Sequence, residues 1–341
     1  MEAAIKKLGE LVKNSGRILV TSHISPDPDA LASLLLMATT LRANYPAKKV
    51  LASMEELSGD LEYLNGYKDI GMTPLGECLE RFRPDLVIIV DTMNFSRCSR
   101  GDSQAIQQWI KDSGAAVAII DHHEPIGVGD NQCYINQKSP AAVQDVYEVC
   151  FEHLGLKKPA GYGVTTLTGL YADTGGFIYD NPRHTATFKI VNELLDSGIS
   201  LETVVNKLKK YSLIFMATLA ELSKNLSRYD DCSYSFLSDE FTSRIDGVAM
   251  FDDVRSAIGL FVNEFIRNID DRRWGFVVYQ DIKGGDKLYS ASFRAVSDTK
   301  DVAAIAQRLG GGGHKPAAGA KFEAASVEEA LEKVKAAISS P

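Results

Sequence analysis

Acidic and imidazole side chains gather at the ends of short apolar runs in the first half of the chain. The run at residues 115–121, for example, ends in an acid that two adjacent histidines follow. The residues concerned are His23, Asp27, Asp29, Asp91, Asp121, His122, His123 and Asp173. If they converge on one crevice, five carboxylates without cations would repel one another and could not all stay ionised. The pattern therefore predicts a metal site.

The ligand types narrow the choice of metal. Asp and His together, without cysteine, suit Mn²⁺, Fe²⁺, Co²⁺ or Zn²⁺ better than Ca²⁺, and Mg²⁺ usually prefers oxygen alone. The ligands exceed what one ion needs, so we predict two ions about 3.5 to 4 Å apart with a bridging carboxylate. Such a pair activates a hydroxide and neutralises a phosphoryl group. Hydrolysis of a phosphate ester is the natural chemistry.

Each residue also has a plainer interpretation. An acid at a strand end is most often a turn residue or a helix N-cap, and a lone histidine is more often hydrogen-bonded structure than a ligand. Asp29, directly before a long helical segment, could be a cap and nothing more. Only their joint placement at the ends of neighbouring strands favours a site.

The elements that must position these residues are four apolar runs without polar alternation. Runs of this kind are typical of strands buried on both faces of a parallel sheet. They cover residues 17–23, 48–53, 85–91 and 115–121, with helix-like segments at 30–44 and 102–112 between them. The βαβα alternation predicts an α/β fold with a doubly wound, largely parallel sheet, which binds ligands beyond the carboxyl ends of its strands.

The second half of the chain has a different pattern. Residues 140–225 favour helix, strands are expected at 232–238, 274–282 and 287–296 with a hairpin turn at 283–286, and helices near 301–309 and 326–338 close the chain. We expect a catalytic domain at 1–200, a helical linker at 201–225 and a smaller α/β domain at 226–341.

Bulk properties limit the partners. The net charge of −8 over 341 residues argues against binding duplex DNA, although a local cluster can still bind a small phosphorylated ligand. No apolar stretch is long enough to span a membrane and the N-terminus lacks a signal-peptide core, so we expect a cytoplasmic protein. Five scattered cysteines suggest neither disulfides nor a zinc–thiolate site.

At this point the residues resemble a known family, the DHH phosphoesterases. SHISPDPDA at 22–30, VDT at 90–92, DHH at 121–123 and YADTGGF at 171–177 are similar to its four motifs. GGGGHKPAAG at 310–319 resembles the glycine-rich signature of the DHH-associated domain. The motifs follow in the family's order across nearly the whole chain.

The resemblance implies a two-manganese site in the cleft between the two domains. By carry-over, one ion is held by His23, Asp27 and Asp91, and the other by Asp29, Asp91, His122 and Asp173. The bridging residue would be Asp91. His123 would lie near the substrate phosphate, with Asp121 close behind the ligands. Pro28 departs from the glycine that the family often carries there, but proline fits the start of a helix.

The glycine-rich run is the expected substrate-binding element. Its backbone N–H groups can approach an anion closely, although a plain turn is the alternative. The substrate-binding set comprises Arg294, Gly311, Gly312, Gly313, His314 and Lys315. The resemblance implies that this domain recognises the terminal phosphate or nucleotide of the substrate while the first domain cleaves.

Architecture separates the substrates within the family. Members that degrade long single-stranded DNA carry an extra oligonucleotide-binding domain, for which we expect no room here. The best resemblance is to the bacterial nanoRNase/pAp phosphatase group, which acts on short oligoribonucleotides, dinucleotides and pAp. A cyclic di-AMP phosphodiesterase, an exopolyphosphatase and a nucleotide sensor without turnover stay open as alternatives, as does a homodimer.

Overall fold

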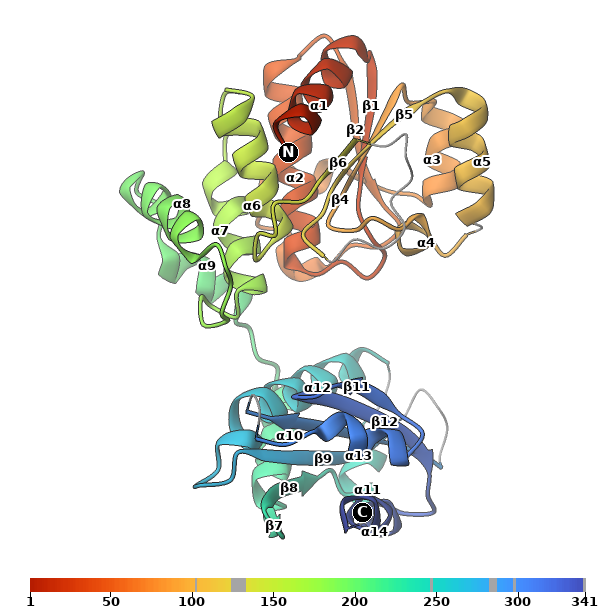
Figure 1. Ribbon diagram of the computed structural model, residues 1–341, viewed down its shortest axis with the longest axis vertical. Coiled ribbons are helices and arrows are strands. Elements are labelled where there is room, and N and C mark those ends of the chain that lie inside the picture. The colour runs from red at the N-terminus through yellow and green to blue at the C-terminus, as the bar shows by residue number, and fades with distance from the viewer. Residues whose placement is uncertain (102, 124–132, 246–247, 282–286, 297–298, 340–341) are drawn as a thin grey trace. The chain divides into compact units, whose positions relative to one another are not determined.

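The computed structural model divides into two compact units, Met1–Lys210 and Tyr211–Pro341 (Figure 1). It describes residues 1–101, 103–123, 133–245, 248–281, 287–296 and 299–339. The turn expected at 283–286 lies outside these residues. Each unit has its own sheet and its own apolar core.

The first unit is built on a six-stranded parallel sheet. Its strands are β1 (Arg17–Thr21), β2 (Lys49–Met54), β3 (Ile70–Met72), β4 (Leu86–Val90), β5 (Ala116–Ile120) and β6 (Cys133–Ile135). They lie in the order β3-β2-β1-β4-β5-β6, and every pairing is parallel. The four predicted strands and the doubly wound α/β class are confirmed, while the two short edge strands were not predicted.

Helices cover both faces of this sheet (Figure 1). They are α1 (Glu2–Asn14), α2 (Pro28–Asn44), α3 (Leu75–Phe82), α4 (Phe95–Cys98), α5 (Ser103–Ser113), α6 (Ala142–Tyr147), α7 (Tyr162–Asp173), α8 (His184–Asp196) and α9 (Leu201–Leu208). One core joins α1, α2, α6 and α7 to one face, and a second joins α3, α4 and α5 to the other. A π-helical segment, Glu148–His153, continues α6.

The strand order fixes where a ligand can bind. From β1 the chain builds outward through β2 and β3, then returns to place β4 on the other side of β1. The carboxyl ends of β1 and β4 therefore form the topological switch point, where doubly wound sheets bind ligands. β5 extends the same edge beside β4.

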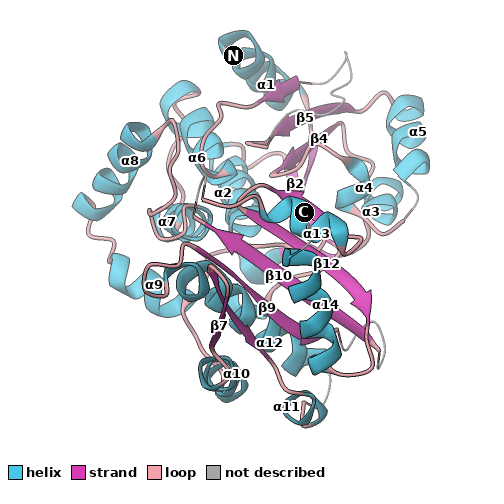
Figure 2. Cartoon of the chain, turned by 60° about the horizontal axis from the view of Figure 1, so that its bottom comes forward, coloured by secondary structure: helices cyan, strands magenta, loops and turns pink. Residues whose placement is uncertain are grey.

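The second unit is a smaller α/β layer structure around a mixed sheet (Figure 2). Its strands are β7 (Ser227–Tyr229), β8 (Cys232–Phe236), β9 (Trp274–Gln280), β10 (Leu288–Ala295), β11 (Gly312–His314) and β12 (Ala317–Glu323). They lie in the order β11-β12-β10-β9-β8-β7, and only the β8–β9 pairing is parallel. The three strands predicted here are present, and the glycine-rich run forms β11, the turn after it and the start of β12 in an antiparallel hairpin.

Two groups of helices pack against this second sheet. The helices of the unit are α10 (Leu213–Lys224), α11 (Asp239–Ser243), α12 (Val248–Leu260), α13 (Val302–Arg308) and α14 (Val327–Ser339). The core beneath α13 and α14 contains Phe276 and Phe293, whereas α10 and α12 share a separate core with Val277. Because side chains alternate along a strand, Phe276 and Val277 face opposite sides of the sheet.

The helices of the described residues are short or carry polar side chains. None of the helices found there is both long enough and apolar enough to cross a bilayer.

Candidate metal centre

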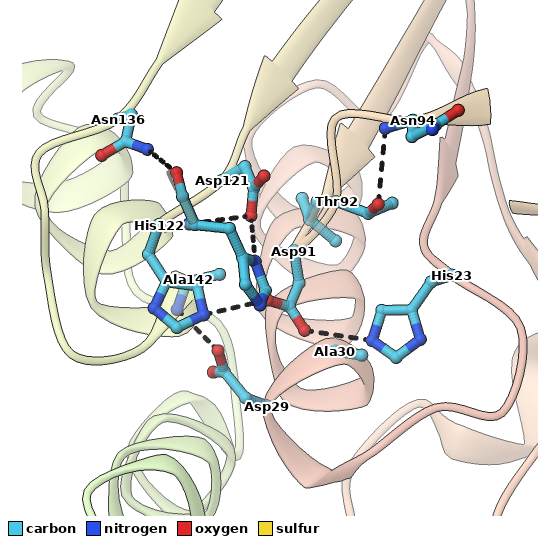
Figure 3. Close-up of polar contacts among 12 residues, drawn as sticks. His23, Asp29, Ala30, Asp91, Thr92, Asn94, Asp121, His122, Asn136 and Ala142 are labelled. Atoms are coloured by element: carbon cyan, nitrogen blue, oxygen red, sulfur yellow. Dashed lines mark hydrogen bonds and ion pairs between the residues drawn. The ribbon is translucent and has the colours of Figure 1, made fainter. Parts of the chain in front are cut away.

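The predicted ligands follow the strands that meet at the switch point. His23 comes two residues after the end of β1, Asp91 comes directly after β4, and Asp121 comes directly after β5. Because carboxyl ends of parallel strands share one edge of the sheet, these residues are brought together (Figure 3). Asp173 joins them as the last residue of α7. Gly175 and Gly176 follow with φ of 60° and 75°, so the chain turns away sharply, as predicted.

The loop after β1 leads into α2 through a proline-started helix. Asp27 is the N-cap, and its side chain accepts a hydrogen bond of 2.9 Å from the Ala30 N–H. Pro28 is the first helical residue, which confirms that proline fits this position. The departure from the family's glycine therefore leaves the start of α2 intact.

Asp29 is fully buried and binds the N-terminus of α6. Its Oδ2 accepts from Ala142 N at 2.6 Å and its Oδ1 from Val143 N at 3.0 Å. Asp29 thus supplies the anion for the N-terminus of α6, where free backbone N–H groups and the helix dipole favour negative charge. Each carboxylate oxygen has a second lone pair, so this contact leaves Asp29 able to bind a cation.

Asp91 lies at the centre of the cluster. His23 Nε2 is 3.3 Å from its Oδ2, and His122 Nε2 is 3.3 Å from its Oδ1 (Figure 3). Its backbone φ is 58°, a left-handed conformation that costs free energy for a residue with a Cβ. Within the described part of the chain, the buried Oδ1 makes no hydrogen bond of good geometry, although it lies in ion-pair distance of His122 Nε2. A buried carboxylate oxygen without such a bond is what a bound cation would satisfy.

Two histidines are oriented by backbone carbonyls. His23 Nδ1 lies 2.8 Å from its neighbour's carbonyl, Ile24 O, and His122 Nδ1 lies 3.2 Å from Ser139 O. A carbonyl can only accept, so Nδ1 carries a proton in both rings and Nε2 is directed at Asp91. Metal-binding histidines commonly donate their other N–H in this way.

Three sets of side chains place their ligand atoms within 4.8 Å of one another. The sets are His23 with Asp27 and Asp91, Asp29 with His122 and Asp173, and Asp91 with His122 and His123. The structure therefore brings together seven of the eight acidic and imidazole residues singled out from the sequence. Clusters of this composition fit divalent metal ions.

The eighth residue, Asp121, stands behind the cluster. Its Oδ1 accepts from His123 Nδ1 at 2.7 Å, and Asp121 itself is fully buried. The side chain of His123 is 47% exposed. Asp121 therefore binds the His123 ring through Nδ1 and leaves Nε2 without a contact to Asp121.

Crowding of charge shifts the pKa values of the cluster. Burial, with the charges of Asp91 and Asp173 adding to it, raises the pKa of Asp29 well above its usual value. Burial also raises the pKa of Asp173 to about 6. For His122 burial acts in the opposite direction, but Asp91 and Asp29 outweigh it and raise the pKa to about 10. Without metal, the cluster holds protons that a cation would displace.

The predicted substrate-binding residues lie in the second unit. Arg294 on β10 is half-buried, and its guanidinium donates to Asn263 Oδ1 and to the Phe293 carbonyl, both at 2.8 Å. His314 and Lys315 are exposed at the tip of the β11–β12 hairpin. Gly311 lines a cavity of about 380 Å³ together with Ser290 and Ser292.

The glycine-rich run also has a packing role. A Cβ on Gly311 would lie 2.2 Å from Gly319 O, and one on Gly313 would lie 2.6 Å from Ala317 O. The N–H of Gly311 donates to Ala306 O. Close approach of β12 therefore requires glycine at two positions of the run, and one of the N–H groups expected to face an anion is already bonded within the domain.

Comparison with known families agrees with this geometry. Residues 17–172 match the DHH family, N-terminal domain, and residues 248–340 match the DHHA1 domain. The chain therefore carries a DHH domain followed by a DHHA1 domain and is a phosphoesterase of the DHH family, as the motifs indicated.

Individual proteins and solved structures are similar to this chain over most of its length. The chain is 25% identical over 307 residues to the bifunctional oligoribonuclease and PAP phosphatase NrnA of Bacillus subtilis, covering 89% of each protein. An exopolyphosphatase-related protein from Bacteroides fragilis shares the fold with a TM-score of 0.75 at 21% identity, over 99% of this chain and 96% of that one. Exonuclease RecJ bound to manganese has a TM-score of 0.51 at 17% identity, over 100% of this chain and 94% of that one.

Sequence reasoning missed the backbone partners of the site. These are the carbonyls that orient the two histidines and the α6 amides that bind Asp29. Backbone groups have no residue-type signature, and the partners of Asp29 are more than one hundred residues away from it in sequence. Only the folded structure could identify them.

Proposed function

We propose that this protein is a manganese-dependent phosphoesterase of very small nucleotides, cleaving short oligoribonucleotides and dinucleotides and removing phosphate from pAp. The convergence of ligand atoms on Asp91 carries the proposal. The match to NrnA over most of both chains supports the substrate class. We expect the protein to act in the cytoplasm.

Two ions fit the donor set. His23, Asp27 and Asp91 would hold one, and Asp29, His122 and Asp173 would hold the other together with the second oxygen of Asp91. Bound ions would neutralise phosphoryl charge and activate the attacking water. The mixed carboxylate and imidazole donors favour manganese over magnesium, and the manganese-bound RecJ fold supports the same choice.

His123 and Asp121 act on the substrate side in this proposal. Asp121 binds Nδ1 of His123 and so keeps the imidazole in one orientation and one tautomer. The exposed imidazole then has Nε2 available to contact a phosphoryl oxygen or to move a proton toward the leaving group. This role is the one that the family resemblance implies for His123, the second histidine of the DHH triplet.

Substrate choice belongs to the second unit. Arg294 supplies a planar cation suited to a phosphate, and the exposed His314 and Lys315 add polar contacts at the hairpin tip. The cavity beside Gly311 is large enough to hold part of one nucleotide. A short substrate can engage such a local patch even though the chain has a net charge of −8.

The test is product release by the Mn²⁺-loaded protein from a panel of substrates. The panel contains a dinucleotide, a short RNA, pAp, cyclic di-AMP, pyrophosphate and polyphosphate, with Asp91→Asn as control. We expect cleavage of the dinucleotide, the short RNA and pAp that needs Mn²⁺ and is abolished in the variant. Faster turnover of cyclic di-AMP or polyphosphate would replace the substrate assignment. Metal and nucleotide binding without any product would instead identify a sensor.

A further inference from the structure

A loop behind the metal centre holds His122 by its backbone. The Nδ1–H of His122 donates to the carbonyl of Ser139, in the connection between β6 and α6. In the same loop, Asn136 Nδ2 donates a second hydrogen bond, to the carbonyl of His123 at 2.7 Å. Residues 136–139 therefore contact both histidines of the triplet, and whatever fixes this loop also fixes the His122 ring.

One buried carboxylate fixes the loop. Asp145, on α6, is fully buried; its Oδ1 accepts from the hydroxyl of Ser139 and its Oδ2 accepts from Gln137 N at 3.2 Å. Between these two contacts Lys138 has a φ of 57°, a conformation that a free loop would rarely keep. Asp145 thus holds both ends of a strained turn.

A cation from a distant segment completes the network. Arg183, just before α8, donates through one guanidinium nitrogen to Ser139 Oγ at 2.5 Å and through another to Glu148 at 2.8 and 3.1 Å. The same guanidinium lies 3.7 Å from Asp145. Buried charges of this kind are expensive to desolvate and are weak evidence for stability, so another reason for the arrangement is needed.

We infer that Ser139, Asp145 and Arg183 are positioning residues that hold the Ser139 carbonyl against Nδ1 of His122, so that Nε2 faces the metal. This inference rests on the proposed function in that His122 is taken as a ligand. The network reaches the His122 ring through one carbonyl, at Nδ1, while Nε2 of the same ring faces Asp91. Groups that orient a metal-binding histidine typically change metal affinity about 10- to 100-fold when they are lost.

The experiment compares two variants that each remove one buried hydroxyl from the same network. Ser139→Ala removes the hydroxyl that joins the loop to Asp145 and Arg183. Thr187→Val removes one that donates to Gln144 Oε1 at 2.8 Å and to the backbone carbonyl of Arg183 at 3.2 Å, and that makes no hydrogen bond to residues 136–139 in the described part of the chain. Calorimetric titration with Mn²⁺ should show affinity weakened about 10- to 100-fold in Ser139→Ala and unchanged in Thr187→Val. Melting temperatures of both metal-free variants measure any general loss of stability.

A second readout observes the hydrogen bond itself. In protein loaded with diamagnetic Zn²⁺ and labelled with ¹⁵N at histidine, the Nδ1–H proton of His122 should resist exchange with solvent. We expect Ser139→Ala to lose that protection and Thr187→Val to keep it. If Ser139→Ala does not fold, Arg183→Lys takes its place, because lysine cannot reach Ser139 and Glu148 together; it should weaken Mn²⁺ binding in the same direction.

The outcomes separate this inference from the proposed function. Failure of the wild-type protein to bind Mn²⁺ would reject the metal centre. Tight binding by the wild type with the same affinity in Ser139→Ala, or an equal loss in Thr187→Val, would overturn the positioning role and leave the metal centre standing.

Discussion

The switch-point edge of the first sheet and the glycine-rich hairpin of the second are built on opposite principles. At the first, ionisable side chains are buried against one another, and their pKa values are displaced by burial and by their neighbours. At the second, the predicted residues are mainly glycines and exposed cations, and two of the glycines are explained by packing against β12. Two of the acids also cap helices, but caps do not require so many charges in one place. Crowded buried charge therefore points to function by itself, whereas a glycine run does not.

Removing the central carboxylate should have the largest effect. Asp91→Asn keeps the shape and tolerates the positive φ, but it removes the charge that the two proposed ions would share. We expect kcat/KM for a dinucleotide to fall by at least about 10³-fold, which is about 4 kcal/mol. Steady-state kinetics with saturating Mn²⁺ measures this, and far-ultraviolet circular dichroism checks the fold. A variant that keeps more than a tenth of the activity would remove Asp91 from the centre of the site.

The second region is tested through its cation. Arg294→Met should raise KM about 10- to 100-fold, since a hydrogen bond to a charged group contributes about 1.5–3 kcal/mol, while Mn²⁺ affinity stays unchanged. The control is Arg228→Met, which removes an exposed arginine of the same unit that pairs with Asp270 at the surface and should have little effect. If Arg294→Met lost metal affinity and substrate affinity to the same extent, the proposed division into a metal-binding region and a substrate-binding region would be wrong.

The packing role of the glycine run is tested with two neighbouring glycines. Gly311→Ala forces a Cβ against Gly319 O, whereas Gly312→Ala meets nothing within 4 Å. We expect Gly311→Ala to lower the free energy of unfolding of the second unit by about 1–3 kcal/mol, the usual cost of overpacking, and Gly312→Ala to be nearly neutral. Thermal unfolding measures both. Equal stability would show that the run is not held by packing.

The protons stored in the first region give a pH dependence. At pH 7 metal must displace the proton on His122, whose pKa is raised to about 10, so Mn²⁺ binding should release protons. Affinity should rise with pH, about tenfold per unit for each proton released. Calorimetry in buffers of different ionisation enthalpy counts these protons. Affinity that is independent of pH between 6 and 8 would contradict the charge crowding.

The stability of the metal-free protein should depend on pH in the opposite direction and fall as the pH rises. A raised histidine pKa contributes stability that is fully present below the unfolded-state value of about 6.5. That contribution is lost as pH rises through the folded-state value of about 10. Metal-free protein should therefore unfold more easily as the pH increases over this window, while metal-loaded protein does not.

Much of the fold could be predicted because its strands are unambiguous. The runs that became β4 and β5 are apolar at every position, and those that became β1 and β2 are apolar without polar alternation in their middle, as strands covered on both faces are. β3, β6 and β7 have three residues each, too few for a periodic signal. Their pairing depends on the neighbouring strand more than on their own composition.

The candidate site could be predicted for a topological reason. Residues at the carboxyl ends of parallel strands must meet, whatever the details of packing, so placing His23, Asp91 and Asp121 at strand ends was sufficient. The amides that bind Asp29 and the carbonyl that orients His122 could not be predicted. They depend on how α6 and the loop before it pack against α2 and β5, which no local pattern encodes.

The most direct measurement is anomalous scattering at the manganese edge from crystals of the Mn²⁺-loaded protein. The account predicts two peaks, one on each side of the Asp91 carboxylate and about 3.5 to 4 Å apart, with His23 and Asp27 at one peak and Asp29, His122 and Asp173 at the other. A single peak, or peaks that leave Asp91 unligated, would contradict it.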